Sequence, residues 1–69
     1  MKTTDTIIHN NTQLTILVEE KEPNKAFATY FVNGFEVKEW ATLKTIWQAI
    51  FTAMLDDICT GNSLVKWSY

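Results

Sequence analysis

Few side chains in this sequence of 69 residues could act as a nucleophile, a base or a metal ligand. His9 is the single histidine and Cys59 the single cysteine. One thiol and one imidazole do not complete a closed zinc site, and a lone cysteine cannot form a disulfide within the chain. A reactive thiol needs a helix N-terminus or nearby cations, whereas Cys59 follows the acidic pair Asp56 and Asp57. We therefore expect a structural cysteine, an exposed histidine, no metal and no cofactor.

The short motifs that mark common enzymes are absent from the sequence. It contains no glycine-rich phosphate loop, no H-E-x-x-H, no C-x-x-C and no G-x-S-x-G. No pair of side chains can be named as an acid and a base, or as a nucleophile and its base. We therefore expect a protein that is not an enzyme.

Composition narrows the class of partner. Six lysines and no arginine stand against eight acidic residues, which gives a net charge of −2. Proteins that bind nucleic acids usually carry a basic patch, and arginine is the residue that they use most to contact phosphates and bases. The charge balance of this sequence therefore disfavours a nucleic-acid partner. The first residues after Met1 are polar, and no apolar run is long enough to cross a membrane. We expect a cytoplasmic protein whose partner is another protein or a second copy of itself.

Three strands are predicted before the helix. Residues 1–11 are polar and read as a loosely ordered N-terminal arm, and residues 12–69 as a single α+β domain. Apolar and polar residues alternate over 13–19, and residues 25–32 are rich in aromatic and β-branched side chains. Asn33-Gly34 predicts a type I′ hairpin turn leading to a third strand over 35–40. This register places Val32 opposite Phe35, Tyr30 opposite Val37, and Phe27 opposite Trp40.

A long helix and a last strand complete the predicted fold. Thr42 is a plausible N-cap for a helix that runs to residue 59 or 60, and Gly61 supplies its C-terminal stop. Residues 64–69 are predicted to form a final strand, which a right-handed crossover would place parallel to the third. Its neighbour in the sheet is either the first or the third of the predicted strands. The prediction is a β-β-β-α-β order, with about four strands in a small antiparallel or mixed sheet and one long helix packed on one face.

One helix cannot cover both faces of this sheet. Alternation places Tyr30 and Val37 on one face and Phe27, Phe31 and Trp40 on the other. Whichever face the helix covers, an apolar group stays open to water, and exposed aromatic groups are typical of interaction sites. Scattered exposed aromatic residues, without an interface, are the alternative.

The helix itself has an unusually wide apolar sector, about 180° where a stripe of about 100° is enough to cover a core. If Leu43, Ile46, Ile50 and Met54 face the sheet, Phe51 and Leu55 lie at the margin. Neighbouring long side chains could cover that margin, or it could bind a partner. Asp56 and Asp57 oppose the helix dipole and could meet a basic partner. The predicted partner-binding residues are Phe27, Phe31, Trp40, Phe51, Leu55, Asp56 and Asp57.

In outline, the chain resembles the small inhibitor proteins of bacteriophages, a class that includes anti-CRISPR proteins and the Dmd-type phage antitoxins. The resemblance lies within residues 25–69 and is carried by the hairpin, Trp40-Ala41-Thr42, the helix, Asp56-Asp57 and the final strand. It implies a protein that binds a host nuclease, toxin or defence complex in the host cytoplasm and blocks its active surface. It assigns no role to an individual residue.

Three functions follow from these observations. The first is a non-enzymatic protein-binding module, acting as an inhibitor that occludes a partner's surface. The second is a structural homodimer closed through the same exposed face. The third is a single-stranded nucleic-acid binder with the sheet aromatics as stacking platforms, which the net charge disfavours.

Overall fold

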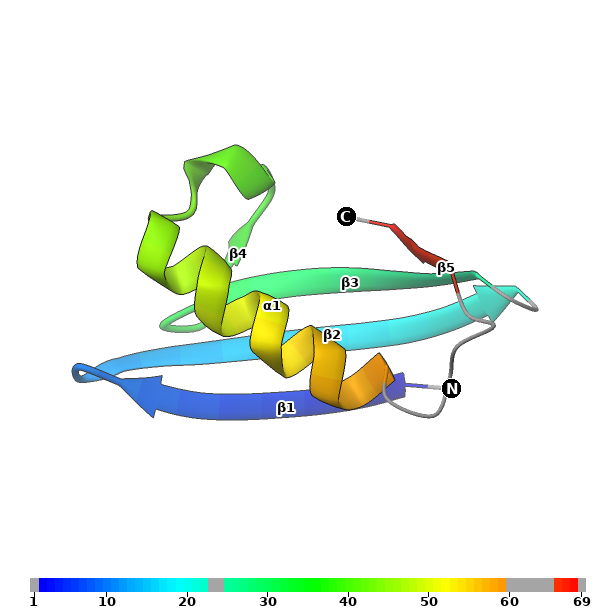
Figure 1. Ribbon diagram of the computed structural model, residues 1–69, viewed down its shortest axis with the longest axis horizontal. Helices are drawn as coiled ribbons and strands as arrows, with labels where there is room; N and C mark the ends of the chain where they lie inside the picture. The colour runs from blue at the N-terminus through cyan, green and yellow to red at the C-terminus, as the bar shows by residue number, and fades with distance from the viewer. Residues whose placement is uncertain (1, 23–24, 60–65, 69) are drawn as a thin grey trace.

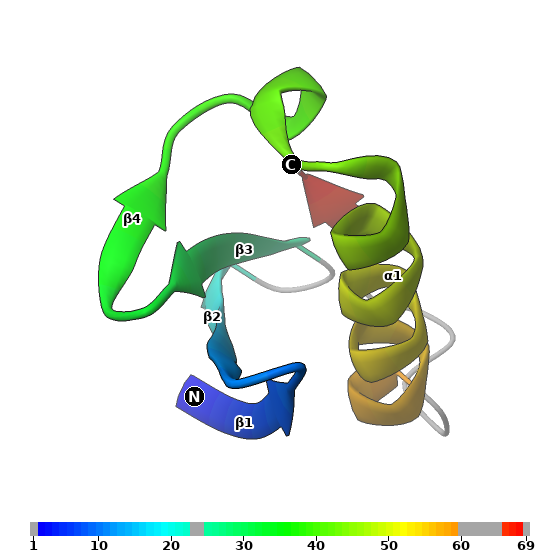
Figure 2. The same cartoon turned by 90° about the vertical axis from the view of Figure 1, so that its left-hand side faces the viewer.

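The computed structural model describes residues 2–22, 25–59 and 66–68 of the chain. Seven elements follow one another, namely β1 (Lys2–His9), β2 (Thr12–Glu22), β3 (Lys25–Val32), β4 (Phe35–Val37), the 3-10 helix η1 (Trp40–Thr42), α1 (Thr45–Cys59) and β5 (Lys66–Ser68). One helix packs on one face of a small, mostly antiparallel sheet (Figures 1 and 2). The predicted α+β class is therefore confirmed.

The four strands β1-β2-β3-β4 lie side by side in chain order, each antiparallel to the next. Two short strands share the far edge of β3. β4 pairs with its last three residues, Tyr30 to Val32, and β5 pairs with its first three, Lys25 to Phe27 (Figure 1). Because β4 is only three residues long, it leaves the other end of that edge open for β5.

The N-terminal segment is a strand, so the prediction of a loose arm over residues 1–11 was wrong. β1 pairs with β2 without a break, from Lys2 opposite Glu19 to His9 opposite Thr12. The turn between them is Asn10-Asn11, and both residues have positive φ, at 49° and 62°. Asparagine tolerates this left-handed region better than most residues, and two such residues in succession make a type I′ hairpin.

The Asn33-Gly34 hairpin is confirmed. Their φ angles are 52° and 83°, and Val32 pairs with Phe35 and Tyr30 with Val37, as expected. The predicted third strand is shorter than expected, because β4 ends at Val37.

A 3-10 turn replaces the rest of that predicted strand. The backbone N–H and the hydroxyl of Thr42 both donate to the carbonyl of Glu39, at 3.1 and 2.7 Å. Trp40 therefore begins η1 and does not pair with Phe27, which corrects the predicted register at this end. The hydroxyl of Thr42 is used within this turn, and α1 begins three residues later, at Thr45. The N-cap role predicted for Thr42 was accordingly wrong.

The carboxyl-terminal part of the prediction is only partly described. α1 ends at Cys59, within the predicted bounds, whereas the expected stop at Gly61 lies outside the described residues, as do residues 64, 65 and 69. β5 runs parallel to β3 and not to the predicted third strand. α1 crosses the sheet diagonally, and β5 lies beside the beginning of β3 (Figure 1).

The core lies between α1 and the sheet face that carries Tyr30 and Val37 (Figure 2). Side chains alternate along each strand, so β2 presents every second residue to the helix. The buried residues are Leu14, Ile16, Val18, Ala26, Tyr30, Leu43, Phe51, Met54 and Leu55.

Candidate interaction surface

The sheet face that α1 does not cover carries a small apolar cluster. Leu17 on β2 pairs with Thr29 on β3, and Thr29 lies between Phe27 and Phe31 on the same strand. Alternation places all four side chains on the face opposite to buried Ile16 and Tyr30. Diagonal neighbours on paired strands lie about 7–8 Å apart, so Leu17 is within reach of both phenylalanine rings. This cluster, Leu17, Phe27, Thr29 and Phe31, is called the open-face cluster below.

The open-face cluster is in contact with water. The Phe27 side chain is 40% exposed, while Leu17, Thr29 and Phe31 are partly buried by their neighbours in the sheet. Ile8, on the same face of β1, is 75% exposed. Ile8 and Phe27 lie near opposite ends of the face, opposite Gln13 and Glu19 of β2. An exposed aromatic ring beside partly buried apolar neighbours is typical of surfaces that bind another molecule.

Threonines surround the cluster. Thr4 and Thr6 on β1 pair with Leu17 and Thr15 on β2, and the hydroxyl oxygens of Thr6 and Thr15 lie 3.1 Å apart. Each threonine presents a methyl group together with a hydroxyl. The face can therefore make both apolar contacts and hydrogen bonds.

Charges lie at the two ends of the open face. Glu36 on β4 pairs with Phe31 and is exposed, which makes that end acidic. At the other end the Lys2 Nζ lies 3.7 Å from the Glu19 Oε2, and the Lys21 Nζ lies 5.4 Å from the centre of the Phe27 ring. Exposed ion pairs contribute little to stability, so these charges bear mainly on orientation and choice of partner.

Only two of the seven predicted partner-binding residues lie on this face, Phe27 and Phe31. Trp40 lies on the helix side, because η1 turns the chain over the sheet: its ring centroid is 4.8 Å from that of Tyr30, and it packs against the core. The prediction that Trp40 shares a face with the two phenylalanines was therefore wrong.

The two predicted residues of the helix margin, Phe51 and Leu55, are in the core. Their side chains are 0% and 4% exposed, whereas Ile46, which was expected to face the sheet, is 52% exposed. The helix is rotated relative to the expectation, because it lies across the strands and buries a stripe centred on Phe51, Met54 and Leu55. Neither Phe51 nor Leu55 can contact a partner without unfolding of the helix.

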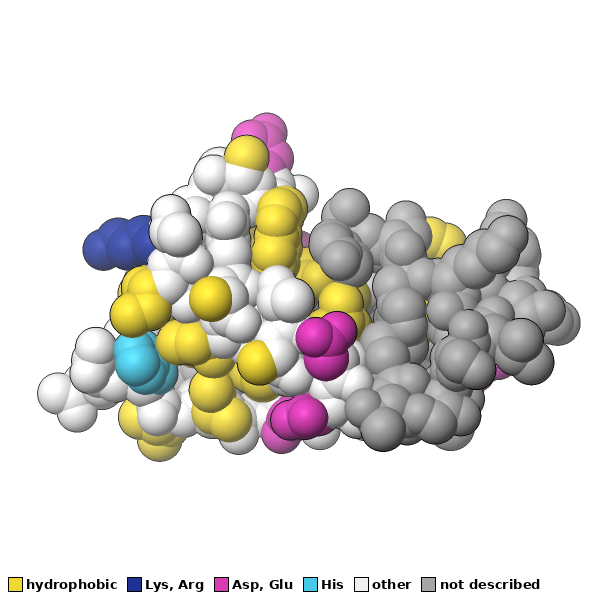
Figure 3. Space-filling view, viewed as in Figure 1, with side chains coloured by type: hydrophobic (Ala, Val, Ile, Leu, Met, Phe, Trp, Pro, Cys, Tyr) yellow, Lys and Arg dark blue, Asp and Glu magenta, His cyan; other side chains and the backbone are white. Residues whose placement is uncertain are grey.

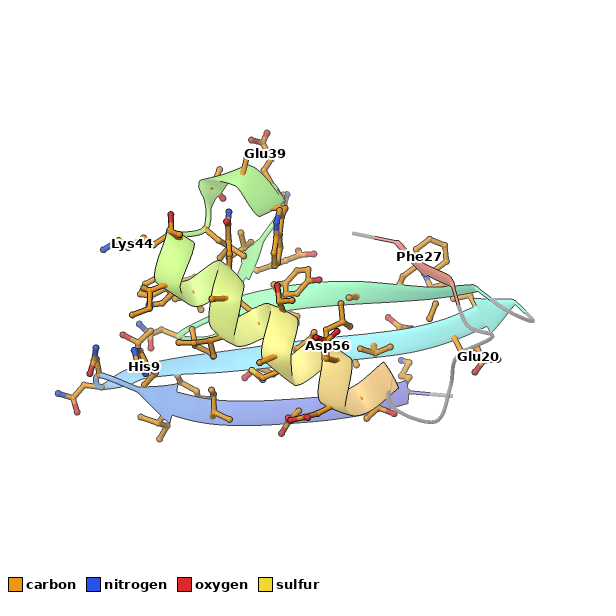
Figure 4. The ribbon with its side chains drawn as sticks, in the orientation of Figure 1. His9, Glu20, Phe27, Glu39, Lys44 and Asp56 are labelled. Atoms are coloured by element: carbon orange, nitrogen blue, oxygen red, sulfur yellow. The ribbon has the colours of Figure 1, made fainter. Side chains whose placement is uncertain are left out.

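Asp56 and Asp57 are exposed, as predicted, but on the other side of the molecule from Phe27 and Phe31. Figure 4 labels Asp56 on α1 and Phe27 on β3, and Figure 3 shows acidic side chains on the helix side, toward the carboxyl end of α1. One partner surface therefore cannot contact the two aspartates and the open-face cluster together unless it wraps around the domain.

Sequence reasoning missed Leu17 and Ile8 as surface residues. Ile8 was placed in a loose arm, and the signal that could have found its strand is Asn10-Asn11, followed by a strictly alternating segment. Leu17 could not be recognised as part of a cluster, because its neighbours Phe27 and Phe31 come from a strand whose register with β2 is not readable from the sequence.

The single histidine contacts the residue that follows it in the chain. His9 is partly buried at the end of β1, which corrects the expectation that it is exposed, and the Asn10 Nδ2 donates to its Nε2 at 3.3 Å. Within residues 2–22, 25–59 and 66–68, no group of three or more His, Cys, Asp or Glu side chains is arranged to hold a metal ion. In the same ranges no helix has the length and apolar character needed to cross a membrane.

Comparison with protein-family models, with curated proteins and with solved structures finds no match for this chain. The geometry of the open face is therefore the basis for a functional proposal.

Proposed function

We propose that this chain is a non-enzymatic protein-binding module that docks through the open-face cluster and inhibits its partner by covering it. The observation that supports the proposal is the position of Phe27, Leu17 and Phe31 as neighbours on the sheet face opposite to α1. Among the described residues, no helix covers that face. Aromatic residues at the centre of such a patch are typical anchors of protein interfaces.

The proposed partner presents an apolar patch with a cation at one side. Phe27 and Phe31 would be desolvated at the centre, and Glu36, next to Phe31, would meet a lysine or arginine of the partner. The chain as a whole carries a net charge of −2, which favours association with a basic surface. The inhibitory role is what the resemblance to small phage inhibitors implies.

The test uses a variant that blocks the face without removing its packing. Thr29→Lys places a charge between the two phenylalanines, on a side chain that is not part of the core. Wild type and variant are immobilised and exposed to lysate of the source cells, and captured proteins are quantified by mass spectrometry. We expect a specific partner to be depleted at least tenfold on Thr29→Lys, and the same loss of affinity with the purified partner.

A matched control places the same charge elsewhere. Ile46→Lys alters an exposed apolar residue on the helix side, and it should bind the partner as wild type does. Circular dichroism and denaturant unfolding confirm that both variants are folded. The proposal is wrong if Thr29→Lys binds the partner as tightly as wild type, or if Ile46→Lys loses binding equally. The inhibitory role is wrong if the partner's own activity is unchanged at saturation.

A further inference from the structure

β1 is an edge strand of the sheet that the described residues form. β1 is eight residues long and forms one margin of the sheet, and none of the described strands pairs with its outer side (Figure 1). Natural edge strands are usually protected by proline, by bulges or by charged residues, above all lysine. β1 contains no proline and its register with β2 is unbroken. Its lysine stands at the first position, and its one other charged residue, Asp5, lies on the helix side of the strand.

The backbone groups on that edge can be assigned to residues. In a two-residue hairpin turn, the flanking residues His9 and Thr12 exchange both backbone hydrogen bonds. The next residue of β2, Gln13, directs its backbone carbonyl toward the β3 side, where it accepts a hydrogen bond from the Asn33 N–H at 2.7 Å. Hydrogen-bonding direction alternates along a strand, so the N–H and C=O groups of Thr4, Thr6 and Ile8 point outward from the sheet.

We propose that a second copy of this chain pairs antiparallel with β1, about a two-fold axis that passes through Ile7. In this arrangement Ile7 lies opposite Ile7 of the second copy, on the helix side of the sheet. Thr6 lies opposite the second copy's Ile8, and their outward backbone groups form the hydrogen bonds. Asp5 lies opposite the second copy's His9, which pairs a carboxylate with an imidazole on both sides of the axis.

Charge disfavours two registers close to this one. Residues that lie opposite each other in an antiparallel pair have their side chains on the same face of the sheet. A two-fold axis between two residues would place neighbours from different faces opposite each other, so the axis must pass through a residue. An axis through Asp5 would place two carboxylates directly opposite each other, which is destabilising. An axis through Thr6 would place Asp5 opposite Ile7, a carboxylate against an apolar side chain. The axis through Ile7 avoids both conflicts.

Pairing at this edge would join the open faces of two copies. Thr6 and Ile8 are exposed on the same face as the open-face cluster, so the sheet would continue across the axis with Phe27 and Phe31 on both sides. The inference does not depend on the proposed function, since it rests on the edge of β1 and not on the cluster.

A register-specific disulfide tests the proposal. In a Cys59→Ser background, Ile7→Cys is oxidised in solution and analysed by mass. Opposite Cα atoms in a non-hydrogen-bonded antiparallel pair are about 4.5 Å apart, a separation that a disulfide can bridge. We expect a covalent species of twice the 8.0 kDa single chain. Thr3→Cys, on the same side of β1 and outside the proposed Asp5–His9 pairs, is the control and should cross-link at least tenfold more slowly. Asp5→Cys reports on the alternative axis through Asp5 and should also cross-link at least tenfold more slowly.

Faster cross-linking of Asp5→Cys than of Ile7→Cys would overturn the register. Equal, slow cross-linking of all three variants, together with a wild-type mass of one chain up to millimolar concentration, would overturn the dimer.

A charge exchange gives a second test that needs no cysteine. His9→Asp places an aspartate opposite Asp5, so sedimentation equilibrium should show a shift from two chains to one. The double variant Asp5→His with His9→Asp restores opposite partners and should restore the dimer, with circular dichroism confirming that both variants are folded. A double variant that stays a single chain would contradict the Asp5–His9 pairing. Thr29→Lys leaves β1 unchanged, so loss of partner binding and loss of the dimer can be distinguished.

Discussion

The Tyr30 ring on β3 and the Phe51 ring on α1 meet nearly at right angles, with their centroids 5.1 Å apart and their planes inclined by 73°. Edge-to-face pairs of this kind add stability beyond the area that they bury. Tyr30 also contacts the Trp40 ring of η1, so one tyrosine joins the sheet, the helix and the turn between them. The position of Phe51 at this junction explains why it belongs to the core and not to a partner surface.

Phe51→Ala should therefore destabilise the fold strongly. Its side chain is fully buried, and truncation of a buried phenylalanine costs about 3–5 kcal/mol in the free energy of unfolding. Urea denaturation followed by circular dichroism measures the loss. Ile46→Ala, on the exposed side of the same helix, is the control and should change stability by less than about 1 kcal/mol. Similar losses for the two variants would contradict the observed rotation of the helix.

Trp40→Ala should reduce stability and leave partner binding by the remaining folded protein intact. The indole packs on Tyr30 and on the core, and its truncation should lower the free energy of unfolding by about 2–4 kcal/mol. This loss is smaller than for a fully buried tryptophan, because Trp40 is only partly buried. Thermal unfolding gives the loss, and binding is measured well below the midpoint. A folded Trp40→Ala variant that no longer binds the partner would place Trp40 in the interface after all.

Gly34→Ala should strain the β3–β4 hairpin. Gly34 has a φ of +83°, and a Cβ there would meet no other atom within 4 Å, so the cost comes from the backbone alone. An L-residue in the left-handed region loses about 1–2 kcal/mol. Chemical synthesis allows the matched control, D-alanine at position 34, which favours positive φ and should be at least as stable as glycine. Equal destabilisation by both alanines would indicate a steric cause instead.

Amide hydrogen exchange should alternate along β1. The N–H groups of Thr3, Asp5, Ile7 and His9 point toward β2 and should be protected, whereas those of Thr4, Thr6 and Ile8 should exchange quickly in dilute solution. Exchange followed by nuclear magnetic resonance, residue by residue, measures the pattern. Uniformly fast exchange over residues 2–9 would indicate that the segment is a loose arm. Protection of Thr6 and Ile8 that grows with protein concentration is the result expected from the proposed pairing at the β1 edge.

Local patterns predicted much of this fold because the responsible residues are close in the chain. Asn33-Gly34 set both the turn and the pairing of Val32 with Phe35, and the bounds of β3 follow from its β-branched and aromatic residues. The same reasoning applied to Asn10-Asn11 would have found β1. That turn was missed because asparagine pairs are a weaker signal than Asn-Gly and the preceding residues are mostly polar.

A candidate site residue could be assigned to a face of the sheet from the sequence only where the alternation of its strand extends to it. The relative faces of Phe27 and Phe31 follow from alternation within one strand, so they could be placed from the sequence. The face of Trp40 could not, because the 3-10 turn closed by Thr42 and Glu39 breaks the alternation before it reaches the indole.

The order of the residues was enough to predict the class of fold, the Asn33-Gly34 hairpin and the excess of apolar side chains over what one helix can cover. Each of these depends on composition or on neighbours within a few residues. The tertiary structure alone decided which apolar residues stay in contact with water. That choice depends on the angle and rotation at which α1 crosses the sheet, and these are set by the simultaneous packing of Phe51, Met54 and Leu55 against strands from distant parts of the chain. A helix with an apolar sector of about 180° offers several such rotations, and only the shape of the sheet selects the one that buries Phe51 and exposes Ile46.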